Sequence, residues 1–210
     1  MLFRSLGWGG PGLLASYQAE RQPIARRNTR FSYAMAESIG RLPLPECIED
    51  DSAAGREARS ILGERLADHV RSEFDIPGIH LGVFYADSPL IGPASGAAPA
   101  DDWHSYRPHA TPGARAPHLW LDDGAAIFDR FGRDFTLLCL GRADPDKARQ
   151  AASAAACEGI PIDILGLDNP VARDLYGADY VLIRPDHHVG WRSDRLPDDF
   201  ASVLARACGH

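Results

Sequence analysis

The order of apolar and polar residues in the second half of the chain predicts strands that alternate with helices. Phe135–Leu140, Ile160–Leu165 and Tyr180–Ile183 are short apolar runs of the kind that forms buried strands. His188–Arg192 alternates apolar and polar residues, and Arg184–His187 before it has the proline and aspartate of a turn. These last two segments, together with the strand before them, predict a β-hairpin.

Proline and glycine mark three helices between and after these strands. Proline favours the first turn of a helix, and glycine favours the position just past its end. The proposed helices begin at Asp144-Pro145, Asn169-Pro170 and Leu196-Pro197 and end at Gly159, Gly177 and Gly209. The resulting order, βαβ-α-ββ-α, is that of a thioredoxin-like fold. We therefore predict an α/β, thioredoxin-like domain over residues 113–210.

The first 75 residues are predicted to be a separate helical segment. Leu13–Arg21 and Pro23–Ile39 indicate two helices separated near Pro23, because proline disrupts a helix interior. After a linker over residues 42–51, Ala53–Phe74 is amphipathic, with one apolar side formed by Ile61, Leu62, Leu66 and Val70. These apolar side chains lack a strand to pack on, so we expect them to need a partner and the helices to open more easily than the strands.

Residues 76–112 are predicted to be a strand followed by a long irregular linker. Gly78–Tyr85 alternates in the manner of a strand, and the rest of this segment is rich in Pro, Ala, Gly and Asp. Gly113–Gly124 then predicts an edge strand with a turn. A helical turn over Ile127–Gly132 is expected to bring two aromatic side chains to the core, Phe128 and Phe131.

Composition and charge narrow the class of protein. With 210 residues, the chain has room for one domain and an attachment, and 45% hydrophobic and 24% charged residues are typical of a soluble globular protein. A net charge of −7 argues against a nucleic acid or an anionic membrane as partner. The chain has no run of 18 apolar residues and no signal-peptide core at its start, so a cytoplasmic location is expected.

The four cysteines raise the question of redox chemistry, and a glycine-rich stretch raises that of nucleotide binding. The sequence around each argues against these functions. The cysteines have no C-x-x-C spacing, and Gly141–Asp146, where a redox thioredoxin carries its thiol pair, contains none of Cys47, Cys139, Cys157 and Cys208. Gly7–Gly12 matches G-x-G-x-x-G, but only six residues precede it and no βαβ unit surrounds it. We interpret it as a loop before a helix.

The remaining polar candidates favour structural roles. His118 next to Trp120 has no second ligand at metal-binding spacing, and His187 and His188 would point to opposite faces of a strand. Asp122-Asp123 and Asp198-Asp199 are typical of turns and helix starts, and Arg21, Arg26, Arg27 and Arg30 of a solvated or ion-paired helix face. We therefore assign no catalytic, cofactor-binding or metal-binding residue in this chain.

Several stretches nevertheless resemble the C-terminal region of FAD-dependent aromatic-ring monooxygenases of the phenol and 3-(3-hydroxyphenyl)propionate hydroxylase group. Gly113–Gly124, Asp129–Gly132 with Phe135–Leu138, and Val181–Arg192 are similar to the C-terminal domain of that family. Gly9–Asn28 is similar to the helix that leaves its flavin domain, and His80–Ile91 to a stretch between the two.

The resemblance implies a parent enzyme that reduces FAD with NAD(P)H and uses O₂ to hydroxylate a phenolic ring. The Gly-rich turn and the Gly-Asp motif that hold FAD in the family are absent from this chain, so we expect a C-terminal fragment, inactive alone, from a truncated reading frame. Its partners would be the missing flavin domain, an aromatic substrate and a second copy as a homodimer. The alternative is a free-standing, non-catalytic thioredoxin-like module for dimerisation or docking.

Overall fold

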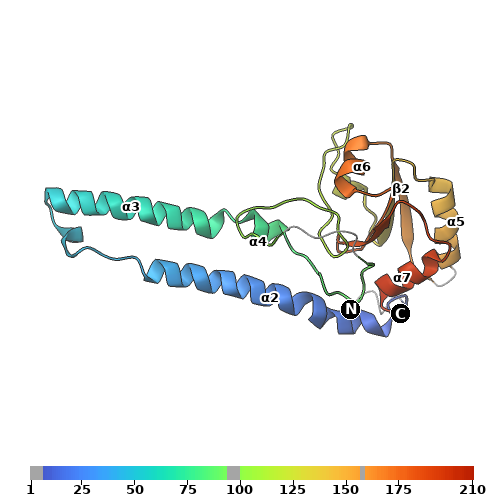
Figure 1. Ribbon diagram of the computed structural model, residues 1–210, viewed down its shortest axis with the longest axis horizontal. Helices are drawn as coiled ribbons and strands as arrows, with labels where there is room; N and C mark the ends of the chain where they lie inside the picture. Colours follow the sequence, from blue (N-terminus) through green and yellow to red (C-terminus); the bar gives the residue numbers. More distant parts are fainter. Residues whose placement is uncertain (1–6, 94–99, 157–158) are drawn as a thin grey trace.

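The computed structural model describes residues 7–93, 100–156 and 159–210, and it consists of a sheet domain with a helical arm (Figure 1). Two long helices form the arm, α2 (Pro11–Gly40) and α3 (Ala53–Phe74), with the 3-10 helix η1 (Glu46–Glu49) between them. The helices run antiparallel and extend away from the sheet domain (Figure 1). The short helix α4 (Pro77–Leu81) follows where the chain returns to the domain.

The domain is built on a four-stranded mixed sheet with the strand order β2-β1-β3-β4. The strands are β1 (Phe135–Leu140), β2 (Ile162–Leu167), β3 (Tyr180–Ile183) and β4 (Val189–Ser193). β1 is parallel to β2 and antiparallel to β3, and β3 is antiparallel to β4. β1 and β3 are buried along their whole length, as their uninterrupted apolar sequences predict. The predicted element order βαβ-α-ββ-α is present.

Helices cover both faces of this sheet. On one face, Phe135, Leu137 and Cys139 pack with residues of α5 (Pro145–Ala156) and α7 (Phe200–Cys208). On the other face, Leu138 and Leu140 pack with α6 (Pro170–Tyr176) and with Ile127 of the 3-10 helix η2 (Ile127–Arg130). The two sets alternate because successive strand residues point to opposite faces. Phe128 and Phe131 pack against the second cluster, as predicted.

The helix termini agree in part with the proline and glycine signals. Gly177 and Gly209 adopt left-handed conformations, with φ of 67° and 83°, just past the ends of α6 and α7. The predicted start of the last helix at Pro197 is wrong. α7 begins at Phe200, because the side chain of Asp199 accepts a hydrogen bond from the Ser202 N–H and so caps the helix there.

Two other predictions of local structure are also wrong. The break near Pro23 is absent, since α2 is continuous and contains this proline in its interior. One missing N–H costs about 3 kcal/mol, and the remaining hydrogen bonds of a 30-residue helix offset it. β2 begins at Ile162 rather than at Ile160, because Pro161 has no N–H to donate to the sheet.

The predicted strands before the sheet are replaced by isolated bridges. Within Gly78–Tyr85, Pro77 starts the helix α4 and only Phe84 forms a bridge, to Ala114. Gly113–Gly124 also forms no strand, and its other bridges join Arg115 to His188 and Trp120 to Ala126. Alternating apolar residues form a strand only where a neighbouring strand offers a continuous row of backbone hydrogen bonds. The prolines of this region have no N–H to donate and interrupt such a row.

The helical arm leaves many apolar side chains in solvent. The exposed ones include Leu14, Tyr17, Tyr33 and Ile39 on α2, Ile61, Leu66, Val70 and Phe74 on α3, and Leu44 between them. Exposed apolar surface of this extent is typical of an interface. None of the helices in the described residues is long and apolar enough to cross a membrane.

The start of α2 is held against the end of α7, and this contact gives the first prediction. Gly10 N–H donates to the Cys208 carbonyl at 2.8 Å, and a Cβ at Gly10 would lie 2.3 Å from the carbonyl oxygen of Gly209. Gly10→Ala should therefore lower the free energy of unfolding in urea by about 1–3 kcal/mol. Gly63→Ala is the matched control, since no atom lies within 4 Å of a Cβ there. It should raise stability by about 0.5–1 kcal/mol, and equal effects of the two substitutions would contradict the contact.

Candidate functional site

A buried ion pair joins the helical arm to the sheet domain. Arg184, in the turn between β3 and β4, donates from Nη1 to Glu20 Oε1 at 2.5 Å and from Nη2 to Glu20 Oε2 at 3.0 Å. Only 8% of the Arg184 side chain and 5% of the Glu20 side chain are exposed. Ser88 Oγ donates to the same carboxylate at 2.6 Å, and Asp186 Oδ2 accepts from Arg184 at 2.9 Å. We call this set the Glu20–Arg184 junction.

Aromatic rings complete the junction. Tyr85 and His188 are stacked with ring centroids 4.4 Å apart, and the guanidinium groups of Arg21 and Arg184 lie 5.3 and 5.7 Å from the Tyr85 ring. Burial raises the pKa of the Tyr85 hydroxyl. Burial also opposes ionisation of Asp186, but hydrogen bonds from His188 and the charge of Arg184 outweigh it and lower the pKa of that carboxyl. The charges of the junction are thus paired with one another, and they link the helical arm to the sheet domain.

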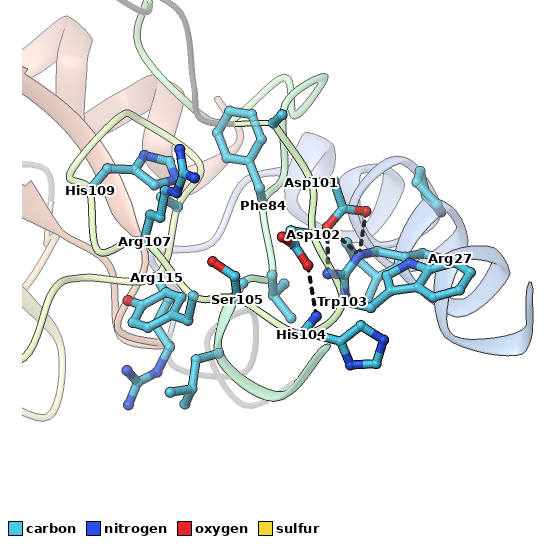
Figure 2. A pocket seen from close by; sticks show the side chains of 18 residues that line it. Arg27, Phe84, Asp101, Asp102, Trp103, His104, Ser105, Arg107, His109 and Arg115 are labelled. Atoms are coloured by element: carbon cyan, nitrogen blue, oxygen red, sulfur yellow. Dashed lines mark hydrogen bonds and ion pairs between the residues drawn. The ribbon is translucent and has the colours of Figure 1, made fainter. Parts of the chain in front are cut away.

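A pocket of about 650 Å³ lies beside the junction (Figure 2). It is bounded by Pro23, Ile24 and Arg27 of α2, by residues 81–84, by residues 100–107 with His109, and by Ala114 and Arg115. Figure 2 shows Arg107 and His109 on one side of the pocket and the Arg27–Asp101 pair on the other. This volume is within the range of small-molecule sites. The pocket is therefore our candidate functional site.

Charges in the pocket are only partly neutralised within it. Arg27 makes a bidentate contact with Asp101, at 2.6 and 2.8 Å, and also donates to the Gly78 carbonyl at 2.9 Å. Arg107 and Arg115, by contrast, form no ion pair with any of the described residues. Burial, reinforced by the charge of Arg192, lowers the pKa of His109, so this imidazole is neutral near pH 7.

The structure brings together few of the residues that the sequence drew attention to. His118 is exposed and contacts Trp120 and Phe128, whereas His187 lies against Phe128 and Phe131 and His188 against Tyr85. Asp122 and Asp123 lie in a turn, as predicted. Cys139 and Cys208 are buried, and burial raises the pKa of Cys139 to about 11, while Cys157 lies outside the described residues. Among the described residues no cluster of three metal ligands occurs.

The pairing of charges in the junction is not predicted from the sequence. The pattern around Arg184 and Asp186 predicts a turn, and Glu20 lies in a predicted helix with no role assigned to its side chain. Arg27 belonged to a predicted ion-paired face, and its contact with Asp101 confirms that interpretation for this residue. A polar residue on the apolar side of α2, such as Glu20 between Tyr17 and Ile24, was the available signal, because a buried charge requires a partner.

The glycine-rich stretch does not fit a flavin phosphate. A phosphate cradle needs free N–H groups at the start of a helix. Here the N–H groups of Gly10 and Gly12 already donate to the carbonyls of Cys208 and Gly209, at 2.8 and 2.9 Å. These glycines instead allow two backbone segments to approach closely.

The chain is similar in sequence and structure to flavin-dependent monooxygenases. Residues 109–210 match the family described as aromatic-ring hydroxylase, C-terminal. The FAD-dependent monooxygenase opdD of Penicillium oxalicum is 33% identical over 97% of this chain and 41% of its own length. Phenol 2-monooxygenase of Pseudomonas sp. is 29% identical over 94% of this chain and 38% of its own. The solved structure of RebC-10x, native and K252c-bound, has 35% identity and a TM-score of 0.84 over 99% of this chain and 39% of that one.

The resemblance noted in the sequence is thereby confirmed. The chain spans about two-fifths of the length of each of these relatives.

Removal of Glu20 tests the junction. Glu20→Ala leaves the buried Arg184 guanidinium with Asp186 as its remaining carboxylate, so the free energy of unfolding should fall by about 3 kcal/mol. Glu37, near the end of the same helix, is the matched control, since its side chain is 39% exposed and pairs with the exposed Arg41 just past the helix end. Glu37→Ala should change stability by less than about 0.5 kcal/mol, as surface pairs do. If urea unfolding gives the same loss for both variants, the junction does not have the role described.

The lowered pKa of Asp186 predicts how stability depends on pH. A carboxyl whose pKa is lower in the folded than in the unfolded chain stabilises the fold above its unfolded value, about 3.9, and this contribution is lost as the pH falls further. The stability difference between the wild type and Asp186→Asn should be constant from about pH 7 to about pH 5 and shrink below about pH 4. Chemical unfolding at each pH measures it. A difference that grows towards acid pH would contradict the sign.

Proposed function

We propose that this chain serves as the C-terminal part of an FAD-dependent monooxygenase acting on phenolic or other aromatic rings, because residues 109–210 match the C-terminal family of aromatic-ring hydroxylases. The proposal rests on a contrast between the sheet domain and the helical arm of this chain. The sheet domain buries two continuous apolar clusters, whereas the arm exposes apolar side chains on both long helices. The arm therefore provides a surface for a further domain.

The partner that we propose for the arm is the flavin-binding part of the enzyme. In this arrangement FAD, reduced by NAD(P)H, supplies the oxidative chemistry when bound to that part. The present chain supplies structure: the Glu20–Arg184 junction fixes α2 against the sheet domain, and exposed side chains such as Val70 and Phe74 contact the flavin-binding part. Consistent with this division, its glycine-rich N–H groups are already bonded to the end of α7.

We further propose that the sheet domain is thioredoxin-like and has no thiol chemistry. The element order and the strand order β2-β1-β3-β4 support this classification. Gly141–Asp146 follows β1 at the position where a redox thioredoxin has its cysteines, and it contains none. The proposed role of the domain is structural, in association with the rest of the enzyme.

A fusion protein tests the proposed function. We expect this chain, joined to the part of phenol 2-monooxygenase outside the aligned region, to give a protein that retains FAD and oxidises NAD(P)H in the presence of phenol. The isolated chain should purify without flavin and should oxidise no NAD(P)H when FAD is added. Absorbance of bound flavin and NAD(P)H consumption are the measurements. Stoichiometric flavin on the isolated chain would contradict the proposal and favour an independent flavoprotein.

Charges placed on the arm test the docking surface in the same fusion protein. Val70→Glu with Phe74→Glu should reduce FAD retention and the oxidation rate several-fold, because burying two carboxylates without partners is unfavourable. Ser60→Glu with Ser72→Glu is the control, since both residues are exposed on the same helix and neither replaces an apolar side chain. Equal activity of the two double variants would favour a free-standing module instead.

A further inference from the structure

The pocket next to the junction combines aromatic walls with an excess of positive charge. Phe84, Trp103 and Tyr106 line it, together with apolar side chains of α2 and of residues 81–83. The Trp103 ring packs edge-on against Phe31 of α2, with ring centroids 5.2 Å apart and an interplanar angle of 79°. The Phe84 and His109 rings also pack edge-on, with centroids 5.7 Å apart. Such walls favour a flat, apolar ring.

The charges of the pocket favour an anion. Three arginines line it against two aspartates, Asp101 and Asp102. Asp101 is neutralised by the bidentate contact with Arg27, and Asp102 accepts a hydrogen bond from the His104 N–H at 2.8 Å. Arg115 lies at the edge of the pocket, with its guanidinium over the Phe128 ring, 4.5 Å from the ring centroid. The exposed Arg107 is the guanidinium best placed to meet a ligand entering from solvent.

We propose that this pocket binds a small planar aromatic anion, such as an aryl carboxylate. Arg107 is the counter-ion, Phe84 and Trp103 contact the ring, and the neutral imidazole of His109 offers a hydrogen-bonding group without adding charge. Ser105, whose hydroxyl is directed towards the space between the two sides of the pocket in Figure 2, is a second polar contact for the carboxylate. This site belongs to the present chain, so it is independent of the proposed flavin-dependent function.

Titration of the isolated chain with benzoate tests the site. The readout is the NMR signal of the Trp103 indole N–H, assigned with Trp103→Phe, because this ring lines the pocket. We expect benzoate to shift the signal saturably in the millimolar range. Benzamide, which has the same shape and no charge, should bind at least about tenfold more weakly, as should acetate, which lacks the ring. No saturable shift with benzoate, or equal binding of benzoate and benzamide, would overturn the proposal.

Variants of Arg107 locate the charge that is recognised. Arg107→Gln should weaken benzoate binding about five- to tenfold, whereas Arg107→Lys, which keeps the charge, should retain most of it. Arg195→Gln is the control, since Arg195 is also exposed and lies outside the pocket. The urea midpoint of each variant shows that the fold is retained, as expected for an exposed side chain. Equal loss of binding in the Arg107→Gln and Arg195→Gln variants would mean that benzoate responds to overall charge, and would contradict this site.

Discussion

The buried ion pair between Glu20 and Arg184 is the interaction on which the arrangement of the arm depends. It joins residues 164 positions apart and removes both charges from water, so each charge is stabilised only while the other is present. It fixes α2 against the β3–β4 turn in one position. Arg27, two helical turns further along the same side of α2, can then reach Asp101 and the Gly78 carbonyl. The pocket exists because α2 is held there.

The sheet domain was largely predictable from sequence because its signals are local. Uninterrupted apolar runs located β1 and β3, and glycines in left-handed conformations ended α6 and α7 where expected. The failures also have local causes. Alternation of apolar residues in Gly78–Tyr85 suggests a strand, but a helix begins at Pro77. β2 begins two residues later than predicted, after Pro161. A long helix tolerated Pro23, which sequence rules place at a boundary.

The candidate site was much less predictable, because it is assembled from distant segments. The pocket takes side chains from α2, from residues 81–84 and 100–109, and from Ala114 and Arg115. Residues 100–109 have no regular secondary structure, so no periodicity indicated which of their side chains meet. The stretches that carry the family resemblance include the lining residues of α2, residues 81–84, Ala114 and Arg115, but the resemblance implies no binding role for them and does not extend to residues 100–109. Charge pairing over 74 residues, as between Arg27 and Asp101, is visible only in three dimensions.

The sheet domain buries two apolar clusters of its own and carries an arm that is fixed at one end and exposes apolar side chains along the rest. Hydrogen exchange followed by mass spectrometry measures this most directly, because it reports the opening of each element separately. We expect strong protection in β1 and β3, intermediate protection around Glu20 at the junction, and fast exchange at the far end of α2 and throughout α3. Protection of α3 equal to that of β1 would contradict it, since the arm would then be stable without a partner.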